Sequence, residues 1–334
     1  MNPKVSIIIL NWNGLKDTIK CLESLKKITY PNYEVLVVDN GSKENDADIL
    51  EEKYKAYIKL IKNKENLGFA EGNNVAIREI LKEGNSEYIL TLNNDTVVEP
   101  NFLDELIGCA KRHSNAGSIQ PKMILKEFPN YIDSVGLELS KTTYGFNQGG
   151  YQPLNLFLNE EEILGCCAGA CLYKAEALKD VKINDEIFDK DFFAYYEDFD
   201  VALRLQWAGW KAWYCSKAIV YHQRGATGGV RSKFTAYYGS RNQIWNFAKN
   251  IPLKFILKNI HFILISHLAH IGINVLKGRF FLLPAILKGK FDAFNGLKDI
   301  VQKKKKIKRK VDFSEIEKWF ILKWRIKIPK EINF

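Results

Sequence analysis

The stretch "KVSIIILNWNG", residues 4–14, decides the fold. An unbroken apolar run of strand length is typical of a strand covered on both faces, whereas a half-exposed strand alternates apolar and polar residues. The run ends at Asn11, Asn13 and Gly14, which are residue types that form turns. The stretch therefore predicts a buried strand with a polar carboxyl end.

The same pattern recurs three times in the next 90 or so residues, in "YEVLVVDNGS", "IKLIKNKENLG" and "YILTLNNDT". Helices are expected between these runs, over residues 15–27, 45–56 and 71–83. Buried strands that alternate with helices predict an α/β fold, a mainly parallel sheet flanked by helices. Ligands of such sheets bind beyond the carboxyl ends of the strands, where all four polar clusters lie. One cluster alone would be ordinary turn chemistry, but four at one edge indicate a polar ligand site.

The composition is that of a folded enzyme rather than of a disordered or fibrous chain. With 334 residues, 46% of them hydrophobic, the protein can bury a large core and carry an appendage. The first residues do not resemble a signal peptide, so we expect a cytoplasmic protein. The six cysteines form no C-x-x-C pair and are expected to be reduced and mostly buried.

The positive charge is concentrated at the end of the chain. Residues 285–334 contain 15 Lys or Arg and 6 Asp or Glu, out of a net charge of +10 for the whole protein. The first 284 residues are therefore nearly neutral, and we expect a folded domain over residues 1–250. A basic, helical extension is expected over residues 251–334.

Residues 186–210, "EIFDKDFFAYYEDFDVALRLQWAGW", combine an aromatic cluster with several acids. A helix is expected to begin near Glu197 and to stop at Gly209. Asp200 is expected to pair with Arg204 one helical turn later. Carboxylates in the first turn are favoured by the helix dipole, which is expected to keep Asp198 ionised at neutral pH.

The order of "VSIIILNWNG", "VVDNGS", "NLGFAEGNNVAI", "LTLNNDT", "FFAYYEDFDVALRLQWAGW" and "VYHQRGATGG" resembles the family-2 inverting glycosyltransferases of GT-A fold, and most closely their rhamnosyltransferase-like branch. The resemblance covers residues 4–245. It implies a GT-A catalytic domain over residues 1–250, with a nucleotide-sugar half at about 1–120 and an acceptor half at about 121–250. It implies transfer of one sugar from a nucleotide-diphosphate sugar, dTDP-rhamnose or a UDP-sugar, to a hydroxyl of a glycan or lipid-linked glycan in cell-surface polysaccharide synthesis. The Q-x-x-R-W motif of processive synthases is absent, which favours single additions.

The resemblance also implies the roles of particular residues. Asp95, in the position of a D-x-D-like motif with Asn93 as a neutral partner, and His222 would hold Mg²⁺ or Mn²⁺ on the donor diphosphate. Asp198 would be the general base, with Glu197 as the second choice. The residues expected to bind the donor nucleotide are Asn11, Asn13, Asp39, Asn66, Gly68, Asn74, Asn93 and Arg224. Arg241 and Asn242 also match the family, and diphosphate binding or packing stays open for them.

The extension contains apolar helices beside a run of lysines. Residues 260–276 are too short and too polar for a confident membrane span, but a helix there has a broad apolar face beside a stripe of Asn259, Ser266, His270, Asn274 and Lys277. That face can pack on the catalytic domain or lie in a membrane interface. A helix with a Ser314–Glu317 capping box and anchoring Trp319 and Trp324 is expected further on.

Together with the basic run at 303–310, these features predict contact with an anionic membrane through residues 260–328, peripheral on the inner face of the cell membrane. A solvated charge run is the simpler interpretation of the lysines. Two other classes are a nucleic-acid-binding protein that uses the basic tail, and an inactive relative that binds anionic lipid. The charge distribution and the absence of a nucleic-acid motif argue against the first, and the acids at 197 and 198 argue against the second.

Overall fold

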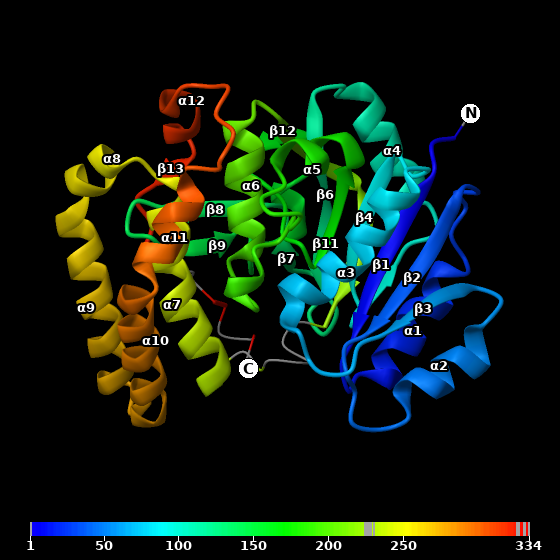
Figure 1. The fold of residues 1–334 in the computed structure, drawn as a ribbon, viewed down its shortest axis with the longest axis horizontal. Helices are drawn as coiled ribbons and strands as arrows, with labels where there is room; N and C mark the ends of the chain where they lie inside the picture. The colour runs from blue at the N-terminus through cyan, green and yellow to red at the C-terminus, as the bar shows by residue number, and fades with distance from the viewer. Residues whose placement is uncertain (1, 224–228, 230, 325–327, 330–331, 333–334) are drawn as a thin grey trace.

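A ten-stranded mixed sheet forms the centre of the protein (Figure 1), in a computed structural model that describes residues 2–223, 229, 231–324, 328–329 and 332. The order of eight strands is β10-β12-β6-β11-β4-β1-β2-β3, while β5 pairs with β12 and β7 with β6. The strands are β1 (Val5–Asn11), β2 (Tyr33–Asp39), β3 (Ile58–Lys62), β4 (Tyr88–Asn93), β5 (Thr96–Val98), β6 (Ala116–Leu125), β7 (Ile132–Ser134), β10 (Glu161–Ile163), β11 (Ala170–Lys174) and β12 (Lys211–His222). Strands β3, β2, β1 and β4 are parallel, and β11 runs antiparallel between β4 and β6. The predicted parallel sheet is confirmed.

Helices cover both faces of this sheet, which explains the unbroken apolar strands. Ile7 and Ile9 of β1 pack into one core with α1, α2 and α4, whereas Ile8 packs into a second core with α3, α5 and α6. The helices of these layers are α1 (Leu15–Leu25), α2 (Asp46–Tyr54), α3 (Gly68–Glu83), α4 (Phe102–Arg112), α5 (Ala175–Val181) and α6 (Glu197–Trp207). Because successive side chains point to opposite faces, each strand serves both cores.

The chain continues into helices that stand beside α6 at the end of the molecule away from β1, β2 and β3 (Figure 1). They are α7 (Lys233–Asn250), α8 (Leu253–Lys258), α9 (Ile260–Leu276), α10 (Leu283–Asn295), α11 (Leu297–Lys304) and α12 (Phe313–Glu317). The remaining elements are the strands β8 (Leu137–Ser140), β9 (Gly145–Asn147) and β13 (Phe320–Ile321) and the 3₁₀ turns η1 (Leu154–Leu156), η2 (Lys190–Phe192) and η3 (Phe280–Leu282). Strand β13 pairs with β8, so the extension returns to residues 1–250 and joins a three-stranded sheet with β8 and β9.

Helix α6 begins at Glu197 and ends at Trp207, followed by Gly209 in the left-handed region at φ 84°, which confirms both predicted ends. The loop expected at "YGFNQGGYQP" contains the short strand β9. The six cysteines are free, and five of them are buried. No helix in the part of the chain that the structure describes is long and apolar enough to cross a membrane.

One expectation for the extension is wrong. The helix near Ser314 is α12, whose N-cap is Asp312 without a side-chain cap, so Ser314 and Glu317 form no capping box. The basic run at 303–310 stays largely exposed, although several of its lysines contact residues of the 1–250 part of the chain. Lys308 and Lys310 both reach the carboxylate of Asp180.

Candidate active site

The carboxyl ends of β1 and β2 join through the buried pair Asn11 and Asp39. The Asn11 amide donates to Asp39 Oδ1 at 2.8 Å and to Asp46 Oδ2 at 3.1 Å, and its carbonyl accepts from Thr18. The Ser42 hydroxyl donates to the same Asp39 oxygen at 2.6 Å. Asn11 is fully buried, so it orients Asp39 rather than reaching a ligand itself.

Asn13 lies at the exposed rim of the same cluster, with φ 51°. Its backbone N–H donates to Ser42 Oγ at 2.9 Å, and its side-chain oxygen accepts from the Lys43 N–H at 2.8 Å. These bonds join the loops after β1 and β2. They use the backbone N–H and the side-chain oxygen of Asn13 and leave its amide nitrogen for other contacts. Asn13 and Asp39 therefore remain the candidates for donor contact at this end of the sheet.

Asp95 and His222 meet where β5 pairs with β12. Their side chains are both buried, and His222 Nε2 lies 3.2 Å from Asp95 Oδ1. On the other side of the ring, Nδ1 lies 2.7 Å from Asp133 Oδ2. A carboxylate that fixes one ring nitrogen, here Asp133, is the usual partner of a metal-binding histidine, and Nε2 is the nitrogen that lies next to Asp95.

The residues at this position fit a divalent cation. Burial lowers the pKa of His222, but the carboxylates of Asp95 and Asp133 outweigh it and raise that pKa to about 10, so the local field favours positive charge. Two ligands at right angles around one ion with bonds of about 2.1 Å lie about 3 Å apart, which is close to the observed separation. The Asn93 amide nitrogen lies 3.4 Å from His222 Nε2, so the side chain of Asn93 adjoins the same position.

Glu197 and Asp198 open α6 with different exposures. Asp198 is half-buried and accepts the N–H of Phe199 at 2.8 Å, whereas Glu197 is 6% exposed and its Oε2 has no hydrogen-bond partner among the described residues. Burial raises the pKa of Asp198 to about 6, against backbone hydrogen bonds that lower it. Burial and the neighbouring Asp198 raise the pKa of Glu197 well above its usual range. Asp198 is thus the carboxylate that is both reachable and ionised at neutral pH, although burial rather than the helix dipole dominates its pKa.

The two residues just before β11, Ala168 and Gly169, contact both the predicted base and the predicted cation site. The backbone of Ala168 donates to Asp198, and the carbonyl of the next residue, Gly169, accepts from the Asn93 N–H at 2.8 Å. A Cβ on Gly169 would lie 3.2 Å from the Asn93 amide nitrogen. The predicted base, Asp198, and Asn93 of the predicted cation site are therefore bonded to the backbone of two consecutive residues.

The loop before α6 is held in an unusual conformation. Phe193, Tyr195 and Tyr196 have φ values of 63°, 68° and 71°, which side-chain-bearing residues rarely adopt. The Asn242 amide donates to three carbonyls of this loop, at 2.7–2.9 Å, and Arg241 donates to two, at 2.6 and 3.1 Å. Arg241 and Asn242 therefore position the loop that precedes the acids, which favours packing as their role.

Helix α3 supports the same loop from the nucleotide half. A Cβ on Gly68 would lie 2.5 Å from the Phe193 carbonyl, so this glycine permits the close approach. Asn66 accepts the Gly68 N–H at 2.9 Å and the Asn40 amide at 3.0 Å. The buried Asn74 binds the backbone of residues 187 and 188 through both ends of its amide. Asn74 is thus occupied with the loop and has no free group for a nucleotide, contrary to the prediction for a donor-binding residue.

A buried charge network lies behind α6. Asp200 pairs with Arg204 and Lys249, each at 2.9 Å, and Lys249 continues to Asp189 at 2.7 Å. Lys303 of the extension also pairs with Asp189. The expected pairing of Asp200 with Arg204 is confirmed, and the pair anchors the helix rather than taking part in chemistry.

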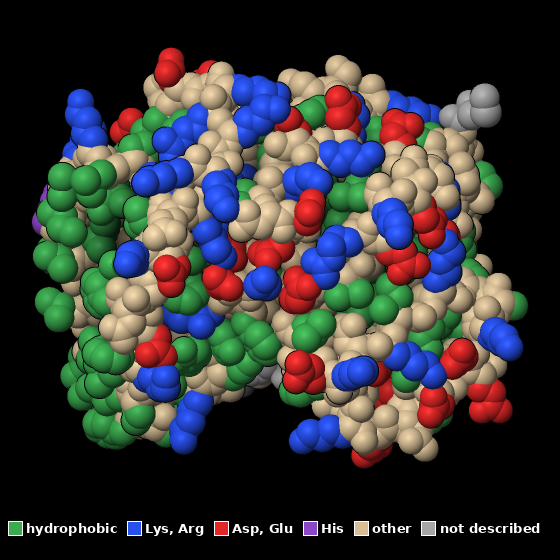
Figure 2. Space-filling view, viewed as in Figure 1, with side chains coloured by type: hydrophobic (Ala, Val, Ile, Leu, Met, Phe, Trp, Pro, Cys, Tyr) green, Lys and Arg blue, Asp and Glu red, His purple; other side chains and the backbone are tan. Residues whose placement is uncertain are grey.

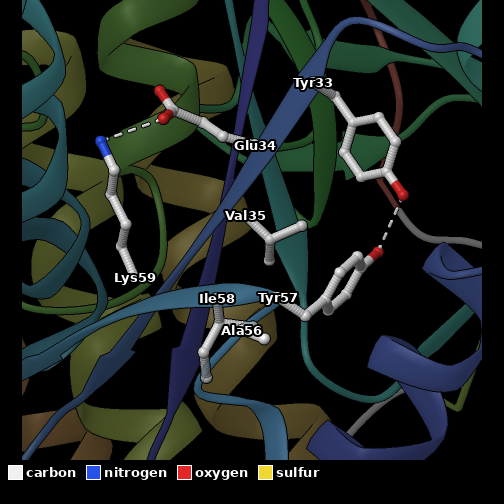
Figure 3. Close-up of a pocket in the computed structure, with 7 residues that line it drawn as sticks. All are labelled: Tyr33, Glu34, Val35, Ala56, Tyr57, Ile58 and Lys59. Carbon is white, nitrogen blue, oxygen red and sulfur yellow. Dashed lines mark hydrogen bonds and ion pairs between the residues drawn. The ribbon is translucent and has the colours of Figure 1, made fainter.

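A pocket lies away from this edge, at the other end of the strands. It is lined by seven residues at the amino-terminal ends of β2 and β3, including Tyr33 and Tyr57, whose hydroxyls are 3.1 Å apart, and Glu34 and Lys59, which pair at 3.0 Å (Figure 3). Ligands of parallel sheets bind at the opposite, carboxyl ends. The pocket therefore carries no part of the candidate site.

Sequence reasoning missed Asp133, and one predicted residue cannot be assessed. Asp133 lies in the region 121–165, where no family motif marks it, and only the pairing of β7 with β6 brings it to His222. Arg224 lies outside the described residues.

Comparison with protein families places these features in context. A model described as "Glycosyl transferase family 2" matches residues 6–182, which is more than half of the chain. An uncharacterised glycosyltransferase of Haemophilus influenzae is 30% identical over 115 residues, 34% of this chain and 37% of that protein. GlyG, a glycosyltransferase of Streptococcus pneumoniae, is 23% identical over 138 residues, 41% of this chain and 42% of that protein. These alignments thus span less than half of either relative.

A longer alignment joins the chain to a rhamnosyltransferase. The N-acetylglucosaminyl-diphospho-decaprenol L-rhamnosyltransferase of Mycobacterium tuberculosis is 24% identical over 249 residues, 69% of this chain and 79% of that protein. Among solved structures, the mannosyltransferase PcManGT of Pyrobaculum calidifontis with GDP-Man and Mn²⁺ superposes with a TM-score of 0.55 at 14% identity, covering 92% of this chain and 85% of that one. GalNAc-T7 with UDP, GalNAc and Mn²⁺ gives the same TM-score and identity over 77% of this chain and 55% of that one. At such identities the likeness is one of fold.

Proposed function

Because the chain belongs to glycosyltransferase family 2, we propose that it transfers one sugar from a nucleotide-diphosphate sugar to a hydroxyl of an acceptor, with inversion at the anomeric carbon. The observation that carries the proposal is the placement of a reachable carboxylate, Asp198, two backbone units from the cluster of Asn93, Asp95 and His222. A base on one side and a site for a leaving diphosphate on the other are what a single displacement requires.

In this reaction the Asp198 carboxylate accepts the proton of the acceptor hydroxyl. The acceptor oxygen forms a bond to the anomeric carbon while the bond from that carbon to the diphosphate oxygen breaks, and the electron pair leaves with the nucleotide diphosphate. Asp198 needs a pKa near the operating pH to act as a base, and a value of about 6 meets this requirement. Glu197 is less suited because it is buried, and burial and the neighbouring Asp198 raise its pKa well above the usual range.

Asp95 and His222 would hold Mg²⁺ or Mn²⁺, with Asp133 fixing the imidazole. Such an ion, when bound, neutralises the charge that develops on the departing diphosphate. Asp39 and Asn13 would contact the nucleotide, positioned by Asn11 and by the loop after β2. Asn66, Gly68 and Asn74 would support the site indirectly, through the loop that precedes the acids.

For the donor we propose dTDP-rhamnose or a UDP-sugar, and for the acceptor a glycan or lipid-linked glycan on the cytoplasmic side of the cell membrane. Support comes from the long alignment with a rhamnosyltransferase whose name specifies a lipid-linked substrate. The division into a catalytic domain, 1–250, and an extension, 251–334, accords with this proposal. Nucleic acid is not an expected partner, because the sequence contains no recognised nucleic-acid motif and the positive charge lies away from the carboxyl edge of the sheet.

The test is a transfer assay with dTDP-rhamnose and with UDP-sugars on polyprenyl-diphosphate-linked acceptors, with free nucleotide diphosphate as the readout. We expect acceptor-dependent release of one nucleotide and a product of inverted anomeric configuration by NMR. Asp198→Asn is the matched inactive control. Retention of configuration, or equal release by the control, would contradict the proposed mechanism.

A further inference from the structure

Helix α9 turns its polar stripe toward the protein. Asn259, Ser266 and Asn274 are each only 5% exposed. Ser266 donates to the Thr142 carbonyl at 3.2 Å, and His267 Nε2 lies 3.1 Å from the Thr143 hydroxyl. Burial and the neighbouring Lys290 lower the pKa of His267 to about 3, so its ring is neutral on this inner side.

The outward side of the same helices is apolar. Large apolar side chains, which folded proteins normally bury, are exposed here: Leu268 to 70% and Leu276 to 88%. Figure 2 shows the hydrophobic side chains gathered along one edge of the molecule, over α9 and α10. We call this surface the α8–α10 face; its large exposed residues are Leu253, Leu257, Ile260, Leu264, Ile265, Leu268, Ile273, Val275, Leu276, Phe280, Phe281, Leu287, Phe291 and Phe294.

The charges around the α8–α10 face are almost all positive. Residues 251–298 contain seven Lys or Arg and a single acid, Asp292. That acid is already paired with Lys288 at 2.6 Å and accepts from the Tyr237 hydroxyl at 2.7 Å. An apolar surface with a basic border matches the lipid tails and anionic headgroups of a membrane interface.

Charge and length choose between the possible occupants of the face. A second copy would bring the same basic border against this one, and like charges across an interface oppose association. Helix α9 has 17 residues. No helix among the described residues, α9 included, is long and apolar enough to cross a membrane. A helix that lies flat at the membrane surface meets neither objection.

We propose that the α8–α10 face is a docking surface for an anionic membrane, on which the exposed side chains of α9 and α10 enter the headgroup boundary. This assignment differs from the expected contact through the basic run at 303–310, because it rests on the apolar side chains and not on that run. The lipid-facing charges are instead those that border the apolar face, such as Lys254 and Lys277, which are exposed. The docking surface does not depend on sugar transfer.

A short chain of contacts connects this surface to the acids of α6. The inner side of α9 touches residues 142–144, and the next residue, Gly145, donates its N–H to the Tyr196 hydroxyl at 3.0 Å. Tyr196 immediately precedes Glu197. If the proposed function holds, docking would thus bring the acceptor side of the site close to a lipid-linked acceptor.

The experiment is co-sedimentation of the full chain with vesicles of phosphatidylcholine, alone or with about a third phosphatidylglycerol. The test variant is Leu264→Glu/Leu268→Glu, at two positions that are 57% and 70% exposed on α9. The matched control is Leu156→Glu/Leu158→Glu, at two leucines that are 60% and 66% exposed in another segment. Nucleotide titration and circular dichroism of each variant report folding and the donor site separately.

We expect binding to the anionic vesicles that weakens with added salt, at least about tenfold weaker binding by the α9 variant, and unchanged binding by the control. No binding by the wild type, or equal binding by both variants, would overturn the proposal. A dimer by light scattering that the α9 variant splits, without vesicle binding, would assign the face to a second copy instead. Loss of vesicle binding with intact nucleotide binding separates this surface from the transferase proposal.

Discussion

The edge of the sheet and helix α9 arrange polar and apolar side chains in opposite senses. At the sheet edge, polar groups such as Asp95 and Asp198 gather above a core of apolar strands. In α9 the polar stripe faces the protein and the apolar side chains face outward. An amphipathic pattern therefore defines two faces of an element but not which of them is buried. The buried face depends on whether the neighbouring elements present polar or apolar groups to it.

The largest effect is expected from Asp198→Asn at the sheet edge. Loss of the base should lower kcat by about 10³, measured by nucleotide release. Because burial raises the pKa of Asp198, its charge opposes folding at neutral pH, and the amide should leave the melting temperature equal or higher. A variant with near-normal kcat, or one that melts much lower, would mean that Asp198 is a structural residue.

Substitution of Asp200, two residues after Asp198, should instead destabilise the fold. Asp200→Asn leaves Arg204 and Lys249 buried without their full counter-charge and should reduce the free energy of unfolding by about 3 kcal/mol, measured with urea. Asp17→Asn is the control, because its pair with Lys20 is on the surface and should contribute less than about 1 kcal/mol. Equal effects of the two variants would contradict the role of the buried network.

These two acids also show what sequence can predict. The pattern of apolar strands and polar ends identified the sheet and its edge, and the four-residue spacing identified the pairing of Asp200 with Arg204. The spacing could not distinguish the half-buried Asp198 from the buried Glu197, because residues from β11 and from the loop held by Asn242 create that difference. Asp133 was equally invisible, since a contact 89 residues away along the chain depends on the pairing of β7 with β6.

The extension was predicted less well for the same reason. The boundaries of α9 and its polar stripe followed from local sequence, but its orientation depends on the residues near 142–145 that receive the stripe. The lysines at 303–310 were expected to face a membrane, and three of them also pair with Asp180 or Asp189. Charge runs carry no local signal of such distant partners.

The orientation of α9 can be measured with a pair of substitutions on its two sides. Ile263→Ser, at a position 9% exposed, should reduce the free energy of unfolding by about 2 kcal/mol. Leu268→Ser, at a position 70% exposed, should change it by less than about 0.5 kcal/mol. If the second variant were the more destabilised one, the helix would face the other way.

A smaller effect is expected from pH. Since the base acts only when ionised and the pKa of Asp198 is raised to about 6, kcat should fall to about half near pH 6 and continue to fall below it. Unfolding does not explain such a loss, because protonation of a carboxyl whose pKa is raised in the folded state favours folding. The fold can be followed by circular dichroism over the same range. A flat profile down to pH 5 would contradict this assignment.

The most direct test of the account is calorimetric titration with UDP and with dTDP, each with Mn²⁺ or with EDTA, on the wild type, Asp95→Ala and the control Asp48→Ala. Asp48 is a suitable control because its side chain is 75% exposed. The account predicts that one nucleotide binds in the presence of Mn²⁺, that EDTA abolishes binding, and that only Asp95→Ala behaves like the EDTA sample. Absence of binding to both nucleotides, or binding that neither EDTA nor Asp95→Ala weakens, would contradict it.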